Sequence, residues 1–277
     1  MSEIDSSTFE REVRGSTPPG LARAALLFAR EIAYPDLRPS EYLAQLDRWV
    51  GSVRIHLHST DTVLTRVGHL SDYLFGTLGL KGNHADYTDP RNSYLNEVMT
   101  RRLGLPISLS AIFIEVGARI GLKVDGVGLP GHFIVGVQAE AGRYFFDPFN
   151  GGVEVTEDDA AHLVRQSVGP AESFNPTWLN ATPPRDIIAR MLSNLRNGYV
   201  EREMWPEAVA VIERLRQTQP GVLGHVRDLG LAHLRQNARR QAVNLLEDYL
   251  ARAPDSPDSP MVKEALASVL NNYARWN

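Results

Sequence analysis

The sequence predicts an α+β domain followed by an all-α repeat region, and three features of the residue pattern support this division. Apolar residues recur at helical spacing in the N-terminal part of the chain, before residue 80. Between residues 124 and 146 the pattern changes to the alternation that is typical of β-strands. From about residue 185 onward the helical spacing returns and repeats at a fixed interval.

The N-terminal part is predicted to form a small helical lobe. Leu21–Ile32 is apolar at helical spacing and indicates the first helix. Ser40 and Asp61 are expected to cap the next two helices, because short polar side chains accept hydrogen bonds from free backbone N–H groups. Residues 1–18 are polar and end in a Thr-Pro-Pro run, so we expect a flexible N-terminus.

A central helix over residues 108–121 is predicted to begin at Ser108 and to precede a small sheet. Strands are expected over residues 124–129, 132–137 and 144–146, joined by tight turns. One helix packed against three antiparallel strands gives an α+β core. The helix is expected to bury the apolar stripe Leu109, Ile112, Phe113, Val116 and Ile120.

The C-terminal part contains an internal repeat. Ala208 and Ala242 are 34 positions apart, and so are Pro220 and Pro254. The alanines allow two helices to approach closely and the prolines end the second helix, which is the tetratricopeptide pattern. A final helix over residues 261–275 is expected to cap the array.

These patterns give a complete domain plan. An α+β domain is expected over residues 19–168, a Pro-containing connector over 169–184 and the repeat domain over 185–277. The repeat groove is predicted either to bind a peptide or to pack on the first domain, and the sequence leaves both possibilities open.

The composition excludes several classes of function. A net charge of −4 gives no electrostatic reason to expect nucleic-acid binding. The 277 residues include no cysteine, which excludes disulfides, thiolate metal sites and cysteine nucleophiles. The chain has neither an apolar run long enough to span a membrane nor a signal-peptide pattern, so we expect a cytoplasmic protein without a membrane partner. No cofactor is indicated, and the sequence gives no oligomeric state.

Three side chains at the edges of predicted elements suggest chemistry: Ser108, His132 and Asp147. A nucleophile at a helix N-terminus benefits from the helix dipole and from nearby backbone N–H groups. A histidine on a neighbouring strand can act as its base, and a carboxylate can hold that histidine in one tautomer. Each residue also has a structural alternative. Ser108 could be only a helix N-cap, His132 a structural partner of Asp147, and Asp147 a turn residue.

Residues 81–96 lack periodicity and are rich in Gly, Asn, Asp and Pro, which predicts a long loop. A loop of this length inside a compact domain is usually functional or mobile. Its polar residues are therefore candidates for binding in a cleft: Asn83, His84, Asp86, Asp89, Arg91, Asn92 and Asn96. A metal site drawing on this loop and His132 is an alternative, although Asn and Asp here also suit loop-forming hydrogen bonds.

Specific motifs follow one another from Lys81 to Gly152. They are Gly82-Asn83, Asp86-Tyr87, Asp89-Pro90-Arg91-Asn92-Ser93-Tyr94-Leu95-Asn96, Gly104-Leu105-Pro106-Ile107-Ser108-Leu109, Leu129-Pro130-Gly131-His132-Phe133 and Phe146-Asp147-Pro148-Phe149-Asn150-Gly151-Gly152. This run resembles the transglutaminase-like core of SirB-type bacterial proteins, a family that also carries C-terminal tetratricopeptide-like repeats. The resemblance implies a papain-like fold, with a helical lobe and a small antiparallel sheet.

The resemblance also bears on activity. Working transglutaminases use a cysteine, a histidine and an aspartate; the last two match His132 and Asp147, and the cysteine position falls near Ser108. A serine hydroxyl is not ionised near neutral pH as a histidine-paired thiol is, so the thiolate route is closed. We therefore expect a pseudoenzyme, a regulatory module that binds a protein or peptide in a retained cleft. The alternative is a Ser-His-Asp amide or ester hydrolase, or an acyl-transfer enzyme.

Overall fold

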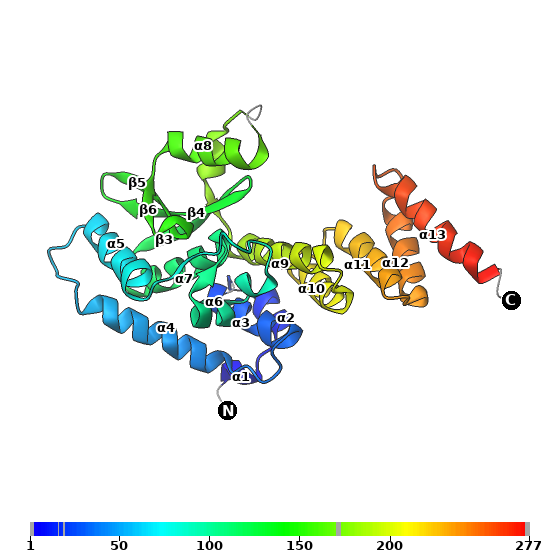
Figure 1. Cartoon of the computed structure of the whole chain (residues 1–277), viewed down its shortest axis with the longest axis horizontal. Helices are drawn as coiled ribbons and strands as arrows, with labels where there is room; N and C mark the ends of the chain where they lie inside the picture. Colours follow the sequence, from blue (N-terminus) through cyan, green and yellow to red (C-terminus); the bar gives the residue numbers. More distant parts are fainter. Residues whose placement is uncertain (1–2, 16, 19, 170–172, 275–277) are drawn as a thin grey trace. The chain divides into compact units, whose positions relative to one another are not determined.

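The computed structural model describes residues 3–15, 17–18, 20–169 and 173–274 (Figure 1). The chain divides into two compact units, Met1–Met191 and Leu192–Asn277. This division falls inside helix α9 (Pro184–Glu201) and not in the expected connector over residues 169–184. The first turns of α9 belong to the first unit, where Ile187 packs against Gly126. Residues 170–172 of the expected connector lie outside the described residues.

The first unit combines a helical lobe with a five-stranded sheet. Its helices are α1 (Glu3–Ser6), α2 (Phe9–Arg14), α3 (Leu21–Ile32), α4 (Pro39–Arg54), α5 (Val63–Ser71), α6 (Leu95–Arg101), α7 (Pro106–Arg119) and α8 (Glu157–Val168). Its strands are β1 (Lys81–Gly82), β2 (Leu103–Gly104), β3 (Lys123–Leu129), β4 (His132–Ala139), β5 (Gly142–Asp147), β6 (Val153–Val155) and β7 (Ala181–Thr182). A π-helical turn, Asp72–Thr77, continues α5, and 3-10 turns lie at Pro90–Asn92, Pro148–Asn150 and Pro176–Leu179.

The N-terminal segment differs from the flexible lead-in that its polarity predicts. It forms α1 and α2, and the side chains of Phe9 and Val13 are buried, with 0% and 1% of their surface exposed. The Phe9 ring meets Phe28 of α3 edge-on, with 6.0 Å between the ring centroids. These two buried residues, together with hydrogen bonds such as that from the Phe9 N–H to Glu31 at 2.7 Å, hold a segment whose other residues are mostly polar.

Two helices of the lobe begin at other residues than the expected caps. Helix α4 starts at Pro39, and Ser40 lies in its first turn, where its Oγ donates to the carboxylate of Asp5 at 2.8 Å. Proline suits the first helical position because the N–H it lacks would have no partner there. Helix α5 is capped by Thr62, whose side chain accepts from a backbone N–H, and not by Asp61.

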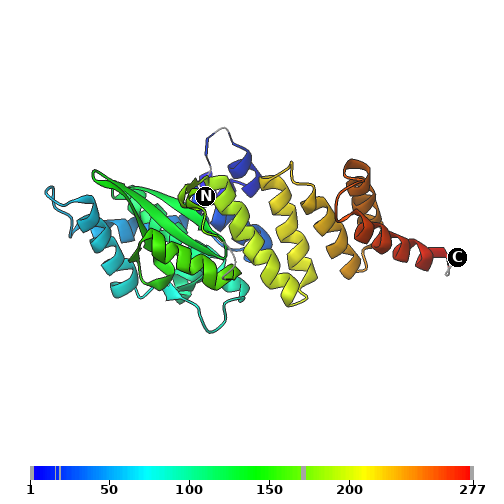
Figure 2. The ribbon, with the colours of Figure 1, turned by 90° about the horizontal axis from the view of Figure 1, so that it is seen from above.

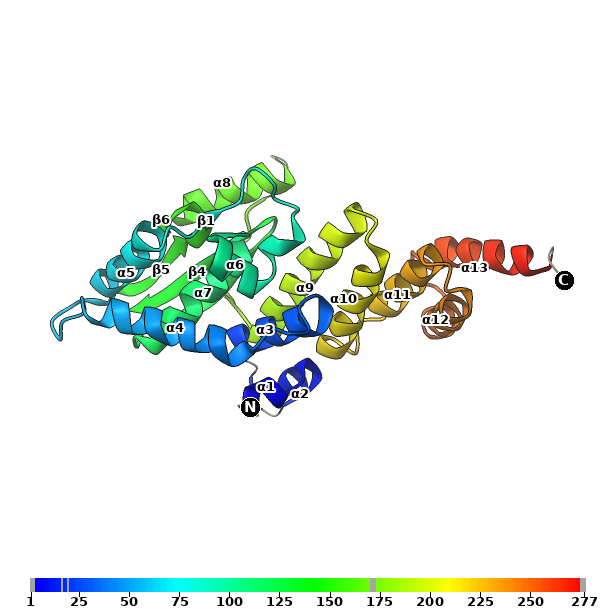
Figure 3. The same ribbon diagram turned by 60° about the horizontal axis from the view of Figure 1, so that its bottom comes forward.

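The central helix α7 likewise begins earlier than predicted. It starts at Pro106 with Leu105 at the N-cap position, which places Ser108 inside the first turn. The predicted apolar stripe of this helix is confirmed, since all of its members are buried. The helices α3 and α4 of the lobe pack against α7 (Figure 3).

The main sheet has the strand order β6-β5-β4-β3-β7, and every neighbouring pair is antiparallel. The three predicted strands form its middle, and the short strands β6 and β7 extend it on both sides. Helices α7 and α8 cover opposite faces of this sheet (Figure 1). In the β3–β4 hairpin, Leu129 is paired with His132, so the tight turn between them carries His132 at the end of the sheet.

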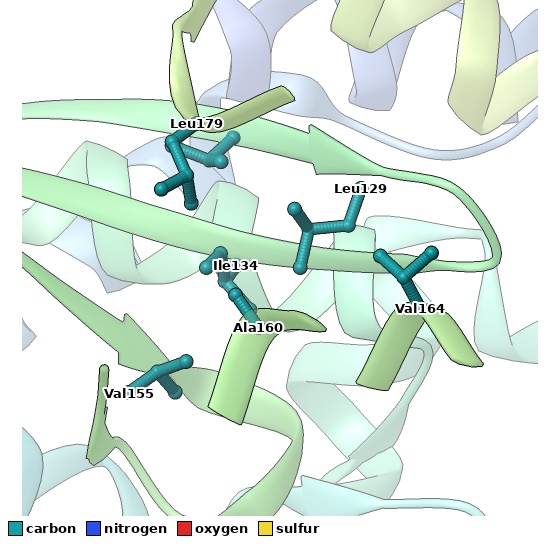
Figure 4. Packing of buried hydrophobic residues seen from close by; sticks show 7 residues of the cluster. Leu129, Ile134, Val155, Ala160, Val164 and Leu179 are labelled. Atoms are coloured by element: carbon teal, nitrogen blue, oxygen red, sulfur yellow. The ribbon is translucent and has the colours of Figure 1, made fainter. Parts of the chain in front are cut away.

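A hydrophobic cluster fills the space between the sheet and α8 (Figure 4). Its buried members are Val127, Leu129, Ile134, Val155, Ala160, Val164 and Leu179. On the other face, Gly126 allows close packing: a Cβ at this position would lie 2.6 Å from Phe133 Cζ and 2.7 Å from Ile187 Cδ1 of α9. The absence of a side chain thus lets α9 approach the sheet.

The second unit consists of paired helices, as the 34-residue period predicts. It contains the end of α9, α10 (Trp205–Thr218), α11 (Gly224–Arg235), α12 (Arg239–Arg252) and α13 (Ser259–Ala274), which lie side by side in yellow to red (Figure 2). The repeat alanines Ala208 and Ala242 are fully buried. Gly230 brings α11 against α12, because a Cβ there would lie 2.6 Å from Leu246 Cδ2. Among the described residues, no helix has the length and apolarity that crossing a membrane requires.

Candidate functional site

His132 and Asp147 lie at the ends of neighbouring strands and form a buried pair. His132 is the first residue of β4 and Asp147 is the last residue of β5. The Nε2 atom of His132 lies 2.8 Å from Oδ2 of Asp147. The two residues are 9% and 1% exposed, so the pair is almost withdrawn from water. The structure therefore brings together two of the three predicted catalytic residues.

The environment of Asp147 keeps its carboxylate ionised. Burial by itself would raise its pKa, but the hydrogen bond and charge of His132, and further bonds from Asn150 and the Phe149 N–H, hold the pKa below its usual value. An ionised carboxylate only accepts, so the hydrogen bond assigns a proton to Nε2 of His132. In the neutral imidazole, Nδ1 then has a free lone pair. In the described part of the chain this atom has no hydrogen bond and is not completely buried.

Phe149 is the centre of a ring cluster around this pair. Its ring centroid lies 4.5 Å from that of His84, 6.0 Å from Tyr87 and 6.0 Å from His132. Gly82 makes room for it, since a Cβ there would lie 2.5 Å from Phe149 Cε2. Phe149 thus connects the polar loop to the histidine. The quoted motifs include this residue, but a phenylalanine after Asp-Pro gives no signal of such a central position.

The polar loop over residues 81–96 is held mainly by its own hydrogen bonds. Asn92 is fully buried. Its Oδ1 atom accepts a hydrogen bond from Nδ2 of Asn83 at 3.0 Å, and its Nδ2 atom donates to the backbone carbonyl of Asp86 at 2.7 Å. His84 and Asp86 are exposed, so these two remain accessible to a ligand. Asn83 and Asn92 have instead the loop-forming contacts that asparagine commonly makes.

Two other predicted binding residues, Asp89 and Asn96, make contacts outside the ring cluster. Asp89, only 6% exposed, binds Arg91 and Arg101 at 2.9 and 3.1 Å. Burial would raise its pKa, but the bonds and charges of the two arginines hold that pKa below the usual value. Asn96 lines a separate cavity of about 320 Å³ together with Tyr34 and neighbouring residues, and its buried Oδ1 atom has no hydrogen-bond partner within the described ranges.

Ser108 is fully buried, and its hydroxyl is engaged by backbone groups. It donates to the carbonyl of Asn92 at 2.7 Å, or of Leu105 at 3.1 Å, and accepts from the Leu105 N–H at 2.9 Å. Gly104 packs against it, since a Cβ there would lie 2.8 Å from the Ser108 Oγ. The serine thus joins the polar loop to the first turn of α7. The Ser108 hydroxyl can act as a nucleophile only if these hydrogen bonds to the backbone break.

Arg190 of α9 belongs to the site although it lies outside the α+β domain that the sequence predicts. Its Nη2 atom donates to the backbone carbonyls of Leu129 and His132, at 2.7 and 2.6 Å. Its guanidinium also stacks over the Phe133 ring, 5.4 Å from the centroid. One arginine therefore ties both ends of the hairpin turn that carries His132. Helical spacing in α9 gives no indication of this long-range contact.

Comparisons with known proteins identify the superfamily of this chain. A model of the Transglutaminase-like superfamily matches residues 40–193. The chain belongs to this superfamily. A tetratricopeptide repeat model matches residues 195–267, which fall in the second unit. The predicted fold class, a transglutaminase-like α+β core followed by an all-α repeat region, is confirmed.

The relatives extend over nearly the whole chain. A UPF0162 protein of Xylella fastidiosa is 37% identical over 91% of this chain and 90% of its own length. UPF0162 protein YchA of Escherichia coli is 21% identical over 90% of this chain and 92% of its own length. Protein SirB1 of Salmonella typhimurium is 22% identical over 88% of this chain and 91% of its own length. A crystal structure of menin covers 87% of this chain with a TM-score of 0.39 and 15% identity, too distant to support an argument.

In this transglutaminase-like chain His132 and Asp147 are hydrogen-bonded to each other, and the sequence contains no cysteine. Within the described ranges, no group of three or more His, Asp or Glu side chains is arranged to hold a metal ion. The polar loop and His132 thus do not assemble the alternative metal site there.

Proposed function

We propose that this transglutaminase-like protein is a non-catalytic module that binds a protein or peptide segment at the His132 site. One observation carries the proposal. His132 is held by Asp147 and its second nitrogen has no hydrogen-bond partner among the described residues, while the hydroxyl at the expected nucleophile position is buried in bonds to Asn92 and Leu105. A retained hydrogen-bonding histidine without an available nucleophile suits recognition more than bond cleavage.

The repeat unit supports a protein partner. Tetratricopeptide arrays present side chains of successive helices on a shared surface that commonly binds peptides. In this unit a cavity of about 320 Å³ is lined by residues of α9, α10 and α11, among them Trp205 and Arg235. The Arg235 guanidinium lies 5.5 Å from the Trp205 ring centroid. Aromatic and arginine side chains are the residues most often found at the energetic centre of protein interfaces.

A first experiment separates binding from catalysis. The full chain is treated with a serine-directed fluorophosphonate and with a panel of amide, ester and thioester substrates, from about pH 6 to pH 9. We expect neither labelling nor turnover, because the Ser108 hydroxyl is buried. Labelling that disappears in both Ser108→Ala and His132→Ala would establish the Ser-His-Asp hydrolase or acyl-transfer alternative.

A second experiment measures recognition directly. A random peptide library is panned against the immobilised full chain, and enriched peptides are titrated against purified variants. His132→Ala is expected to weaken binding about tenfold or more for peptides at this site, as for a central interface residue. The control Gly51→Ala changes a helical glycine that has no atom within 4 Å of an added Cβ and should leave the affinity unchanged. Absence of any enriched peptide that depends on His132 would refute the proposal.

A further inference from the structure

Arg190 carries a positive charge that has no carboxylate partner among the described residues. It is half-buried, and both of its hydrogen bonds go to neutral backbone carbonyls through the same atom, Nη2. Its ring contact is with the uncharged Phe133. Burial lowers the pKa of Arg190, but a guanidinium stays charged in proteins. A partly desolvated charge of this kind is stabilised when an anion approaches it.

The remaining donors of Arg190 are accessible. Its Nε and Nη1 atoms have no hydrogen-bond partner in the described part of the chain, and neither atom is completely buried. They therefore reach solvent. Gly128 leaves space on this side, since a Cβ there would lie 3.0 Å from Nη1. A guanidinium with open N–H groups matches the geometry of carboxylate and phosphate oxygens.

Tyr87 is a polar member of the ring cluster around His132. Its side chain is 44% exposed although its ring contacts Phe149. Burial raises the pKa of Tyr87, and the positive charge of Arg190 lowers it. At neutral pH the phenol keeps its proton and can donate a hydrogen bond. The nearby carboxylate of Asp147 is buried and bound to His132, which limits its repulsion of an incoming anion.

We propose that Arg190, with Tyr87, recognises an oxyanion of the bound segment, a carboxylate or a phosphorylated side chain, next to His132. The inference rests on the proposed function and adds the chemistry of the ligand. Arg190 bonds the backbone carbonyl of His132, so its guanidinium lies at the hairpin turn that carries this residue. Recognition of a charged group at a half-buried cation would give this site its selectivity against neutral segments.

The test uses small probes and the full-length protein. Imidazole and backbone NMR signals of residues 131–133 are followed during titration with the N-acetyl methylamides of glutamate, glutamine and phosphoserine at constant ionic strength. We expect saturable shifts with glutamate or phosphoserine, and binding of the neutral glutamine probe at least about tenfold weaker, as for a charge-assisted hydrogen bond. The tighter of the two charged probes identifies the source of the oxyanion.

Two variants assign the effect to Arg190. Arg190→Gln is expected to weaken binding of the charged probe about tenfold or more. Arg185→Gln is the matched control, because Arg185 also lies on α9 and donates to a backbone carbonyl, that of Val13 at 2.6 Å; it should bind the probe like the natural protein. If Arg190→Gln does not fold, Tyr87→Phe at the exposed phenol gives the second reading, with a severalfold loss expected.

The outcomes also separate this inference from the function on which it rests. Equal binding of the glutamate and glutamine probes, absence of saturable shifts, or unchanged affinity in the folded Arg190→Gln protein would each overturn it. A neutral peptide that binds in a His132-dependent way would leave the proposed function intact and remove only the anion requirement. Fluorophosphonate labelling of Ser108 would instead refute the non-catalytic function and leave the anion requirement intact.

Discussion

Asp147 illustrates how a single residue is fixed by its surroundings. Its two carboxylate oxygens accept hydrogen bonds from His132, Asn150 and the Phe149 backbone. Each of these donors favours the ionised form, and together they outweigh the desolvation that burial imposes. The same bonds that orient His132 therefore also make the stability of the fold depend on the charge of Asp147.

The folded pKa of Asp147 is depressed, so its contribution to stability is present above the unfolded pKa of about 3.9 and is lost as the pH falls through the lower folded value. We expect Asp147→Asn to lower the free energy of unfolding at pH 7 by about 2 kcal/mol, and to flatten its decline below about pH 4. Urea denaturation across this range measures both. Asp36→Asn at an exposed carboxylate is the control, and an unchanged decline in Asp147→Asn would contradict the prediction.

Ser108 permits a second test at the residue scale. Removing its hydroxyl leaves the buried Asn92 carbonyl and the Leu105 N–H with poorer partners. We expect Ser108→Ala to lower the free energy of unfolding by about 1–3 kcal/mol. Ser52→Ala removes a hydroxyl that donates to the Arg48 carbonyl on the surface of α4 and should cost less than about 0.5 kcal/mol. Similar values for the two variants would show that Ser108 has no structural role.

At the scale of elements, short strands position the ring cluster. Strands β1 and β2 pair in parallel through Lys81 with Leu103 and Gly82 with Gly104. Gly82 faces the Phe149 ring of the turn after β5, and Gly104 faces Ser108 of α7. Two glycines in one small ladder thus bring the polar loop, the central helix and the end of the main sheet into contact.

We therefore expect Gly82→Ala to act beyond its own position. The new methyl would displace the Phe149 ring, lower the free energy of unfolding by about 1–3 kcal/mol and shift the imidazole signals of His132 in NMR spectra. Gly51→Ala, in open space on α4, should be neutral or stabilise by up to about 1 kcal/mol. Unperturbed His132 signals in a stably folded Gly82→Ala protein would count against the ring cluster.

At the scale of the whole molecule, the chain has two compact units with separate cores. The cluster beneath α8 is built from residues of the first unit, and that around Leu246 and Tyr249 from residues of the second. Units with their own cores can open independently, and hydrogen exchange reports such local opening.

A glycine inside the second unit tests this independence. Gly230→Ala is expected to separate α11 from α12, because its Cβ would meet the buried Leu246 at 2.6 Å. Amide exchange in these two helices should accelerate about tenfold or more, as a loss of about 1–3 kcal/mol requires, while exchange in β3 and β4 stays unchanged. Gly221→Ala has open space and serves as the control. Equal acceleration in the sheet would mean that the two units unfold together.

The sequence by itself determined the elements that one buried face defines. Alternation gave the three middle strands, the apolar stripe gave α7, and the 34-residue period gave the paired helices, because burial of one face imposes its own periodicity on the residues. The pairing of His132 with Asp147 also followed from local order, since two strands joined by a short turn bring their outer ends together.

Only the tertiary structure decided the contacts between residues far apart in the chain. The Ser108 hydroxyl binds the Asn92 carbonyl, Phe149 lies against Gly82, and Arg190 reaches the hairpin turn from a helix that periodicity assigned to the repeats. No local pattern encodes such partners, because they depend on which surfaces meet when the helices and the sheet pack. The physical reason is that periodicity records whether a side chain is buried, whereas only the packing of the elements decides which residue it contacts.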